Sequence, residues 1–261
     1  MRISFFEEFP VPKNLEKIKL LQKPTKIYLA APSVRKFLEI KEIVKKQREG
    51  EKVKEIIYWP TLERKEGYWI SPFSERKALQ RIFQELNKSQ KTQGKKIPVM
   101  LDLELPTTRN PFLYFTQSLF FFANKKLILS FIQNYAGEVY LAEYYPEEKK
   151  SEKILEILGL HFSPMKANKQ IKIIKMLYHS SHHFSKHSMH AKMQRGMQEY
   201  GDDFLAGLGV LASGLGSEPL ISPQQLYEDL ACAQQTRVQE VILFRLGGLH
   251  RKYVKVLEKF V

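Results

Sequence analysis

Lys26-Ile27-Tyr28-Leu29-Ala30-Ala31-Pro32-Ser33 joins the end of one strand to the start of one helix. The apolar run that begins at Ile27 is typical of a buried strand, and Pro32 ends it because proline has no N–H for a sheet ladder. Ser33 is a good helix N-cap, and apolar residues recur at helical spacing between Val34 and Val44. The stretch therefore predicts one strand–helix unit.

The same unit recurs along the whole chain. Apolar strand-like runs are centred near residues 4, 28, 57, 101, 140, 174, 207 and 242, and a helical pattern follows each of them. Eight consecutive units predict a closed (β/α)₈ TIM barrel, with residues 1–261 as a single domain. The alternative is an open doubly wound sheet, which normally carries a glycine-rich phosphate loop after its first strand; Phe9-Pro10-Val11-Pro12 contains no glycine.

Composition indicates an ordinary globular protein, because 43% of the 261 residues are hydrophobic. The first six residues lead directly into Glu7 and Glu8 and lack the pattern of a signal peptide. The apolar stretch 112–132 is interrupted by polar and charged residues, which argues against a membrane span. The single cysteine, Cys232, allows no internal disulfide. We expect a cytoplasmic protein with no membrane partner.

The formal net charge of +14 raises the question of nucleic-acid binding. The excess consists mostly of lysines that are dispersed along the chain without a basic stripe or a zinc knuckle. Dispersed lysine is more often a solvated surface, so a nucleic-acid partner is the less expected interpretation.

Two acids follow the fourth apolar run, Val99-Met100-Leu101-Asp102-Leu103-Glu104. Side chains alternate along a strand, so Asp102 and Glu104 are expected on one face. Repulsion and partial burial can keep one of two neighbouring carboxyl groups protonated, which suits proton transfer. The alternative is that the pair only caps the next helix or binds a lysine.

Active sites of such barrels lie at the carboxyl ends of the strands. Aromatic residues there are candidate platforms for sugar rings: Trp59, Tyr68, Trp69, Tyr144 and Tyr145. Glu143 is a second available acid. Arg245 is expected either to bind a substrate carboxylate or to pair with Glu7 or Glu8. Nothing in the pattern calls for a cofactor.

Three short segments resemble the chitinase-type barrels of glycoside hydrolase family 18. They are Asp102-Leu103-Glu104, Met176-Leu177-Tyr178 and Val241-Ile242-Leu243-Phe244. The chain departs from the family pattern at three positions, where the family has Asp, Asp and Trp and this sequence has Met100, His179 and Phe244. Family 25 lysozyme-like barrels are similar at the strand-four motif.

The resemblance implies a glycosidase acting on an N-acetylhexosamine-containing glycan. Glu104 would protonate the leaving oxygen, Asp102 would orient the substrate acetamido group, and Tyr178 would donate a hydrogen bond to that group. Substrate contacts are then expected from Trp59, Trp69, Glu143, Tyr144, His179 and Arg245. The departures leave open a catalytically silent sugar-binding barrel.

Five histidines lie between residues 179 and 190. On one helix, His183, His187 and His190 would share a face, which makes a metal site geometrically possible. A metal-dependent hydrolase, with His179 or His182 joining Asp102 and Glu143, is therefore a further alternative. A solvated polar helix is favoured over it, and no metal is expected.

Overall fold

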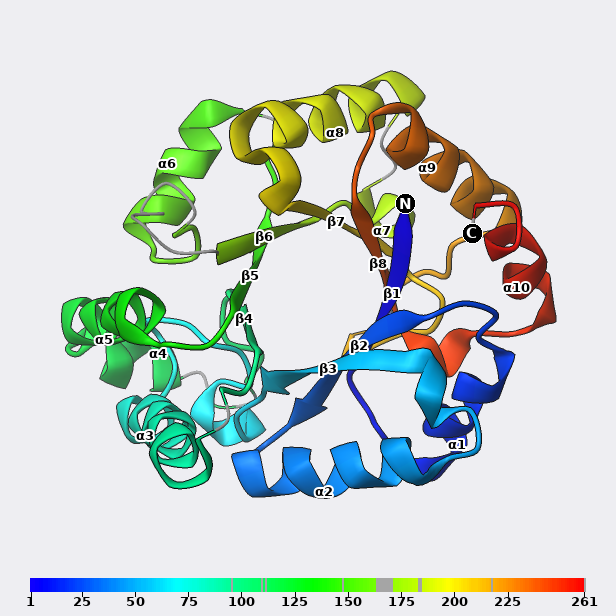
Figure 1. Cartoon of the computed structure of the whole chain (residues 1–261). Helices are drawn as coiled ribbons and strands as arrows, with labels where there is room; N and C mark the ends of the chain where they lie inside the picture. The colour runs from blue at the N-terminus through cyan, green and yellow to red at the C-terminus, as the bar shows by residue number, and fades with distance from the viewer. Residues whose placement is uncertain are drawn as a thin grey trace. The chain divides into compact units, whose positions relative to one another are not determined.

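The computed structural model describes residues 1–94, 96–108, 110, 112–146, 148–162, 171–182, 185–216 and 218–260. Its eight strands form a closed parallel barrel in the order β1 to β8 (Figure 1). This confirms the (β/α)₈ prediction. The strands are β1 Arg2–Glu7, β2 Thr25–Ala31, β3 Val53–Pro60, β4 Val99–Asp102, β5 Val139–Tyr144, β6 Ile171–Met176, β7 Phe204–Gly209 and β8 Glu240–Phe244.

Helices alternate with these strands. The α-helices are α1 Pro12–Leu15, α2 Val34–Lys46, α3 Arg76–Gln93, α4 Phe112–Ser118, α5 Phe121–Asn134, α6 Lys149–Ile157, α7 His179–His182, α8 Lys186–Tyr200, α9 Pro223–Gln235 and α10 Arg251–Leu257. Short 3-10 helices are η1 Glu16–Leu20, η2 Gly50–Lys52, η3 Arg64–Glu66, η5 Gly201–Asp203 and η6 Leu246–Gly248.

The chain groups into two compact units. Unit 1 comprises Met1–Ala30, Glu39–Ile57 and Ile174–Val261, and unit 2 comprises Ala31–Leu38 and Tyr58–Ile173. The expectation of a single domain stays a prediction, and each unit is described by itself below.

Unit 1 is built on β1 and its neighbours. Phe5 pairs with Ile27 of β2 and with Leu243 of β8, so β1 is bonded on both sides. Helices α8 and α9 cover the outer side of β7 (Figure 1). The helix starts follow the sequence signals, since the hydroxyl of Ser222 accepts the Gln225 amide at 3.1 Å and caps α9.

Unit 2 is built on β4 and β5, which pair from Val99 opposite Val139 to Asp102 opposite Ala142. Helices α3 and α5 pack against each other through the stacked rings of Phe83 and Phe131, whose centroids are 4.3 Å apart. All four residues of β4 are buried, so the strand is held in the barrel up to its last residue, Asp102.

Three boundaries differ from the expectations. Strand β4 ends at Asp102, so Glu104 lies in the following segment. The apolar stretch 112–132 lies in two helices, because the chain turns at Leu119 and Phe120. The helix expected to carry His183, His187 and His190 begins at Lys186, since the Ser185 hydroxyl accepts the Ser188 amide and caps α8 there.

A membrane-crossing helix needs a long apolar stretch. Within the described part of the chain, no helix is both long enough and apolar enough to cross a bilayer.

Candidate functional site

The acid pair lies in unit 2, at the carboxyl end of β4. Asp102 is the last strand residue and is 5% exposed, whereas Glu104 is half-buried. The Leu103 amide donates to the Ala142 carbonyl at 3.0 Å, so the chain follows β5 for one residue beyond the strand. Glu104 is therefore held next to the end of β5.

Tyr144, the last residue of β5, meets this pair. Its hydroxyl donates to Oε2 of Glu104 at 2.8 Å. Burial raises the pKa of Tyr144 most, and the charges of Glu104 and Asp102 raise it further. Both carboxylates therefore act on one phenol, which stays a neutral hydrogen-bond donor at ordinary pH.

A loop after β3 braces the acidic segment. The Ile70 amide donates to the Asp102 carbonyl at 3.1 Å, and the Thr107 amide donates to the Gly67 carbonyl at 3.0 Å. Gly67 has φ of +118°, and a Cβ there would lie 2.8 Å from the Ser74 hydroxyl, so glycine is required. Backbone hydrogen bonds therefore hold the chain at Asp102 and at Thr107, on either side of Glu104.

The two tryptophans belong to the same unit. Their rings stack with centroids 5.9 Å apart, and Trp69 also donates from Nε1 to the Thr107 hydroxyl at 3.1 Å. Trp59 is 1% and Trp69 7% exposed, whereas Tyr68, which packs edge-on against Trp69, is half-buried. The indoles therefore present little surface to a sugar ring, and their role as platforms stays a prediction.

Glu143 has a local role. Its side chain is fully buried, and Oε1 accepts the Phe162 amide at 2.7 Å while Oε2 lies 3.4 Å from Nε2 of His161. This carboxylate fixes the segment that follows α6. Its expected contact with substrate stays a prediction.

In unit 1, Tyr178 follows β6 and lies against Phe244 at the end of β8. Their ring centroids are 5.8 Å apart, and Phe6 packs on Phe244 at 6.3 Å. Tyr178 is half-buried and Phe244 is 8% exposed. Two of the three segments that resemble the chitinase family thus meet within this unit.

Arg245 pairs with Glu7, which is one of the two roles expected for it. Nη1 lies 3.2 Å from Oε1 of Glu7, Nε donates to the Ser213 carbonyl at 3.0 Å, and the guanidinium lies 4.9 Å from the Phe9 ring centre. Burial raises the pKa of Glu7, and the charge of Arg245 opposes that rise. The alternative of a substrate carboxylate on Arg245 stays a prediction.

His179 meets a carboxylate that the sequence did not point to. Nδ1 lies 3.2 Å from Oδ1 of Asp229, and Gln225 donates to the same oxygen at 2.9 Å. Burial raises the pKa of Asp229 to about 6, against the lowering effects of Gln225 and His179. The two partners are 50 positions apart in the chain, so no local motif could have joined them.

Only part of the histidine cluster lies within the described residues. His183 lies outside the described residues, as does the side chain of His182, while His187 and His190 lie on α8. No group of three His, Cys, Asp or Glu side chains that could hold a metal ion occurs within the described ranges.

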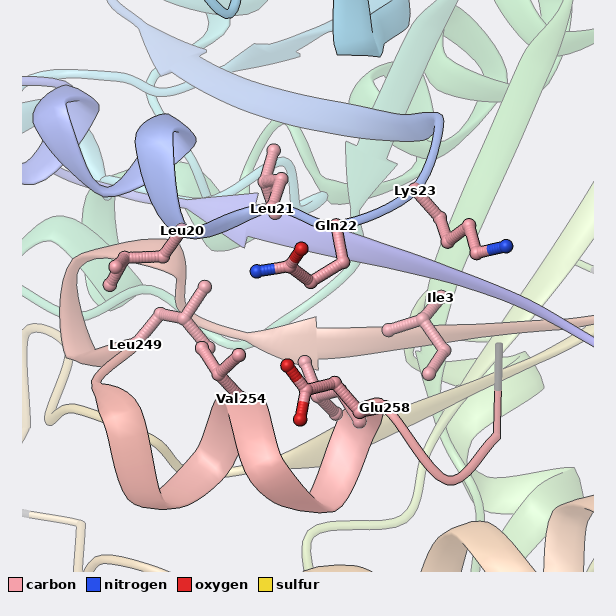
Figure 2. Close-up of a pocket in the computed structure, with 9 residues that line it drawn as sticks. Ile3, Leu20, Leu21, Gln22, Lys23, Leu249, Val254 and Glu258 are labelled. Atoms are coloured by element: carbon pink, nitrogen blue, oxygen red, sulfur yellow. The ribbon is translucent and has the colours of Figure 1, made fainter.

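Figure 2 shows a hollow in unit 1. It lies between the start of β1 and α10, with Gln22 and Glu258 at its wall (Figure 2). Ile3 lines it, near the amino end of the strand that ends at Glu7. The hollow contains none of the predicted site residues and is a separate feature.

Sequence reasoning named Tyr144 only as a stacking platform and missed Asp229 and Thr107. For Tyr144 a signal existed, because it ends β5 and β5 pairs with the strand that carries the acids. Adjacent parallel strands bring their carboxyl ends together. For Asp229 and Thr107 no comparable local signal exists.

No protein-family model matches the sequence, and a search of curated proteins gave no significant match. Solved structures do match its fold. A class V chitinase from Pseudomonas fluorescens Pf-5 has a TM-score of 0.60 and 10% identity over 99% of both chains. A GH18 chitinase from Pseudoalteromonas aurantia has a TM-score of 0.54 and 10% identity over 100% of both chains.

A sugar-isomerising enzyme is similar as well. D-allulose 3-epimerase from Methylomonas sp. has a TM-score of 0.53 and 11% identity, over 100% of this chain and 98% of that chain. At these identities the likeness concerns the fold. The chain is therefore a TIM barrel similar to GH18 chitinases, in agreement with the resemblance that its sequence motifs predicted.

Proposed function

We propose that this protein is a glycosidase that acts on an N-acetylhexosamine-containing glycan. The observation that carries the proposal is the arrangement at the end of β4, where the Tyr144 hydroxyl binds Glu104 and the charge of Asp102 acts on the same hydroxyl. Glycosidases usually use two carboxyl groups whose surroundings differ, so that one is protonated and the other is ionised.

In this mechanism Glu104 is the general acid. It gives its proton to the glycosidic oxygen as the bond breaks, and Tyr144 holds Oε2 so that Oε1 carries the proton. Asp102 is more buried than Glu104 and acts as a fixed negative charge. It orients the N–H of the acetamido group, whose carbonyl oxygen attacks the anomeric carbon from within the substrate.

Tyr178 takes its role from the family resemblance. Its hydroxyl would donate to the acetamido carbonyl and keep that oxygen in position for attack. Trp59 and Trp69 are proposed to contact the sugar, and the loop that carries Trp69 also bonds to the Asp102 carbonyl and to Thr107.

A second candidate is a sugar-binding barrel without turnover. The replacements at Met100, His179 and Phe244 favour it, because these positions carry Asp, Asp and Trp in the family that the chain resembles. Calorimetric binding of N-acetylhexosamine oligomers without release of product would support this candidate over the first.

The test compares two chromogenic substrates that share one leaving group, an N-acetylhexosaminide and the plain hexoside. We expect the wild-type protein to cleave only the first, because the acetamido group supplies the nucleophile. Glu104→Gln should reduce cleavage by about 10²- to 10⁴-fold, which is the usual contribution of a general acid.

A matched control exists at the other end of β5. There the Tyr140 hydroxyl donates to Oε2 of Glu138 at 3.3 Å, so Glu138→Gln alters the same kind of pair away from the carboxyl end of the strand. We expect full activity in this control. Equal activity in Glu104→Gln and Glu138→Gln would exclude Glu104 as the acid.

A further inference from the structure

An apolar stripe is exposed along α4, the turn after it and the start of α5, in unit 2. Its members are large apolar side chains at steps of three, four and three residues: Phe112 and Phe115 lie on α4, Leu119 in the turn after it, and Phe122 on α5. Their exposed fractions are 72% for Phe112, 76% for Phe115, 83% for Leu119 and 83% for Phe122. We call these four residues the aromatic stripe.

The buried side of this segment carries two hydrogen-bonded amides beside apolar side chains such as Leu113 and Ile128. Gln117 is 8% exposed and accepts the Arg76 amide at 3.2 Å through its side-chain oxygen. Asn124 is fully buried and donates to the carbonyls of Pro72 and Ser74 at 2.9 and 3.1 Å. The segment therefore buries two bonded amides together with apolar side chains, and it also leaves four large apolar side chains exposed.

The inward hydrogen bonds of Gln117 and Asn124 hold the segment in this orientation, with the stripe exposed. Polar groups that are satisfied inside the protein hold the helix by specific bonds, so the rings cannot turn inward without breaking them. Exposed apolar patches of this kind mark surfaces that bind a protein or a membrane.

The charges around the stripe distinguish between these occupants. No Asp or Glu occurs between Glu104 and Glu138, while Lys125 and Lys126 come three and four residues after Phe122. Aromatic and aliphatic side chains with adjoining lysines are the composition of segments that lie in a membrane interface. Anionic lipid attracts each nearby lysine.

A second copy of the chain is a poorer occupant. Each copy carries a formal net charge of +14, so two copies repel each other, whereas an anionic bilayer attracts both.

We propose that the aromatic stripe docks the protein on the surface of an anionic lipid bilayer, with Phe115 and Phe122 inserted and Lys126 beside the headgroups. Docking on a surface needs no spanning helix. It revises the sequence-based expectation of no membrane partner. The proposal is independent of the glycosidase mechanism, because its readout is lipid binding.

The experiment measures sedimentation of the full chain with vesicles of phosphatidylcholine, alone or mixed with phosphatidylglycerol. We expect binding to the mixed vesicles that weakens as salt is raised. Phe115→Ser/Phe122→Ser should weaken this binding by about tenfold or more, because two rings no longer leave water. Both rings are exposed, so the variant should keep the wild-type melting temperature.

Matched controls separate the stripe from general surface effects. Ile43→Ser/Leu220→Ser removes two other exposed apolar side chains, 53% and 58% exposed, and should bind as the wild type does. Lys126→Glu should weaken binding to the mixed vesicles more than Lys46→Glu on α2, which changes the net charge equally.

Three results would overturn the proposal. The first is no binding of the wild type to the mixed vesicles. The second is equal binding by the two serine double variants. The third is self-association that the stripe variant alone abolishes, because that would assign the stripe to a second copy of the chain.

Discussion

Glu7 at the end of β1 and Glu104 just beyond β4 are both acids at the carboxyl end of a barrel strand. Glu7 is fully buried, pairs with Arg245 and accepts the backbone amides of Phe9 and Gly247 at 2.9 and 2.6 Å. Glu104 is half-buried, and its Oε2 accepts the neutral phenol of Tyr144.

The different partners of Glu7 and Glu104 indicate which of the two acids suits proton transfer. A carboxylate that accepts from an arginine and two backbone amides cannot move or lose its charge without leaving those donors unpaired, which is unfavourable. A half-buried carboxyl group beside a neutral phenol can gain or lose a proton while its neighbours stay in place. Position at a strand end is thus not sufficient, and the partners decide the role.

The largest effect should come from Glu104→Gln, which should lower activity strongly and leave stability nearly unchanged. We expect cleavage of the N-acetylhexosaminide to fall by about 10²- to 10⁴-fold, while the free energy of unfolding changes by less than about 1 kcal/mol. Urea denaturation and steady-state kinetics on the same sample measure both. A large loss of stability would make Glu104 a structural acid like Glu7 and end the contrast.

Glu7→Ala should show the opposite pattern. It leaves the Arg245 charge and two backbone amides without their acceptor, so we expect the free energy of unfolding to fall by about 3 kcal/mol. Urea denaturation measures the loss. Glu42→Ala is the control, because both Glu42 and its partner Lys45 are exposed and the change should be small. Similar losses in both variants would contradict the bracing role of Glu7.

Asp229 extends the comparison to a third carboxyl group. Its pKa of about 6 in the folded protein lies above the ordinary 3.8. The stabilising contribution is therefore complete below the ordinary pKa and is lost as pH rises to about 6. Asp229→Asn should remove this dependence and gain about 3 kcal/mol over the wild type across that window. Melting curves at several pH values test this, and parallel curves for the two proteins would refute it.

Tyr144→Phe should give the smallest effect. Loss of one hydrogen bond to Glu104 should lower kcat by about tenfold and leave KM nearly unchanged, because the phenol positions the acid and does not hold the sugar. Tyr140→Phe, which removes the bond to Glu138, should leave kcat as it is. Equal kinetics in the two variants would show that Tyr144 does not position Glu104.

The repeat of strand and helix signals was enough to predict the barrel. Apolar runs such as Ile27 to Ala31 and caps such as Ser222 are local features, and each acts within a few residues. The turn at Leu119 and Phe120 escaped prediction, because neither glycine nor proline marks a break between Phe112 and Ile132.

The candidate site could be predicted in part. The residue types Asp102, Glu104 and Tyr178 were found from short motifs, while the pairing of Glu7 with Arg245 was one of two alternatives. Tyr144, the partner of Glu104, could have been inferred from the strand order, whereas Asp229, the partner of His179, lies 50 positions away and no spacing points to it.

The sequence by itself determined the architecture and the supply of acids, because strand periodicity and helix caps are encoded within a few neighbouring residues. Only the tertiary structure decided which acid is braced, which meets a phenol, and that α4 turns its rings to solvent. Burial, charge pairing and the inward amides of Gln117 and Asn124 depend on residues far apart in the chain, and folding alone brings those residues together.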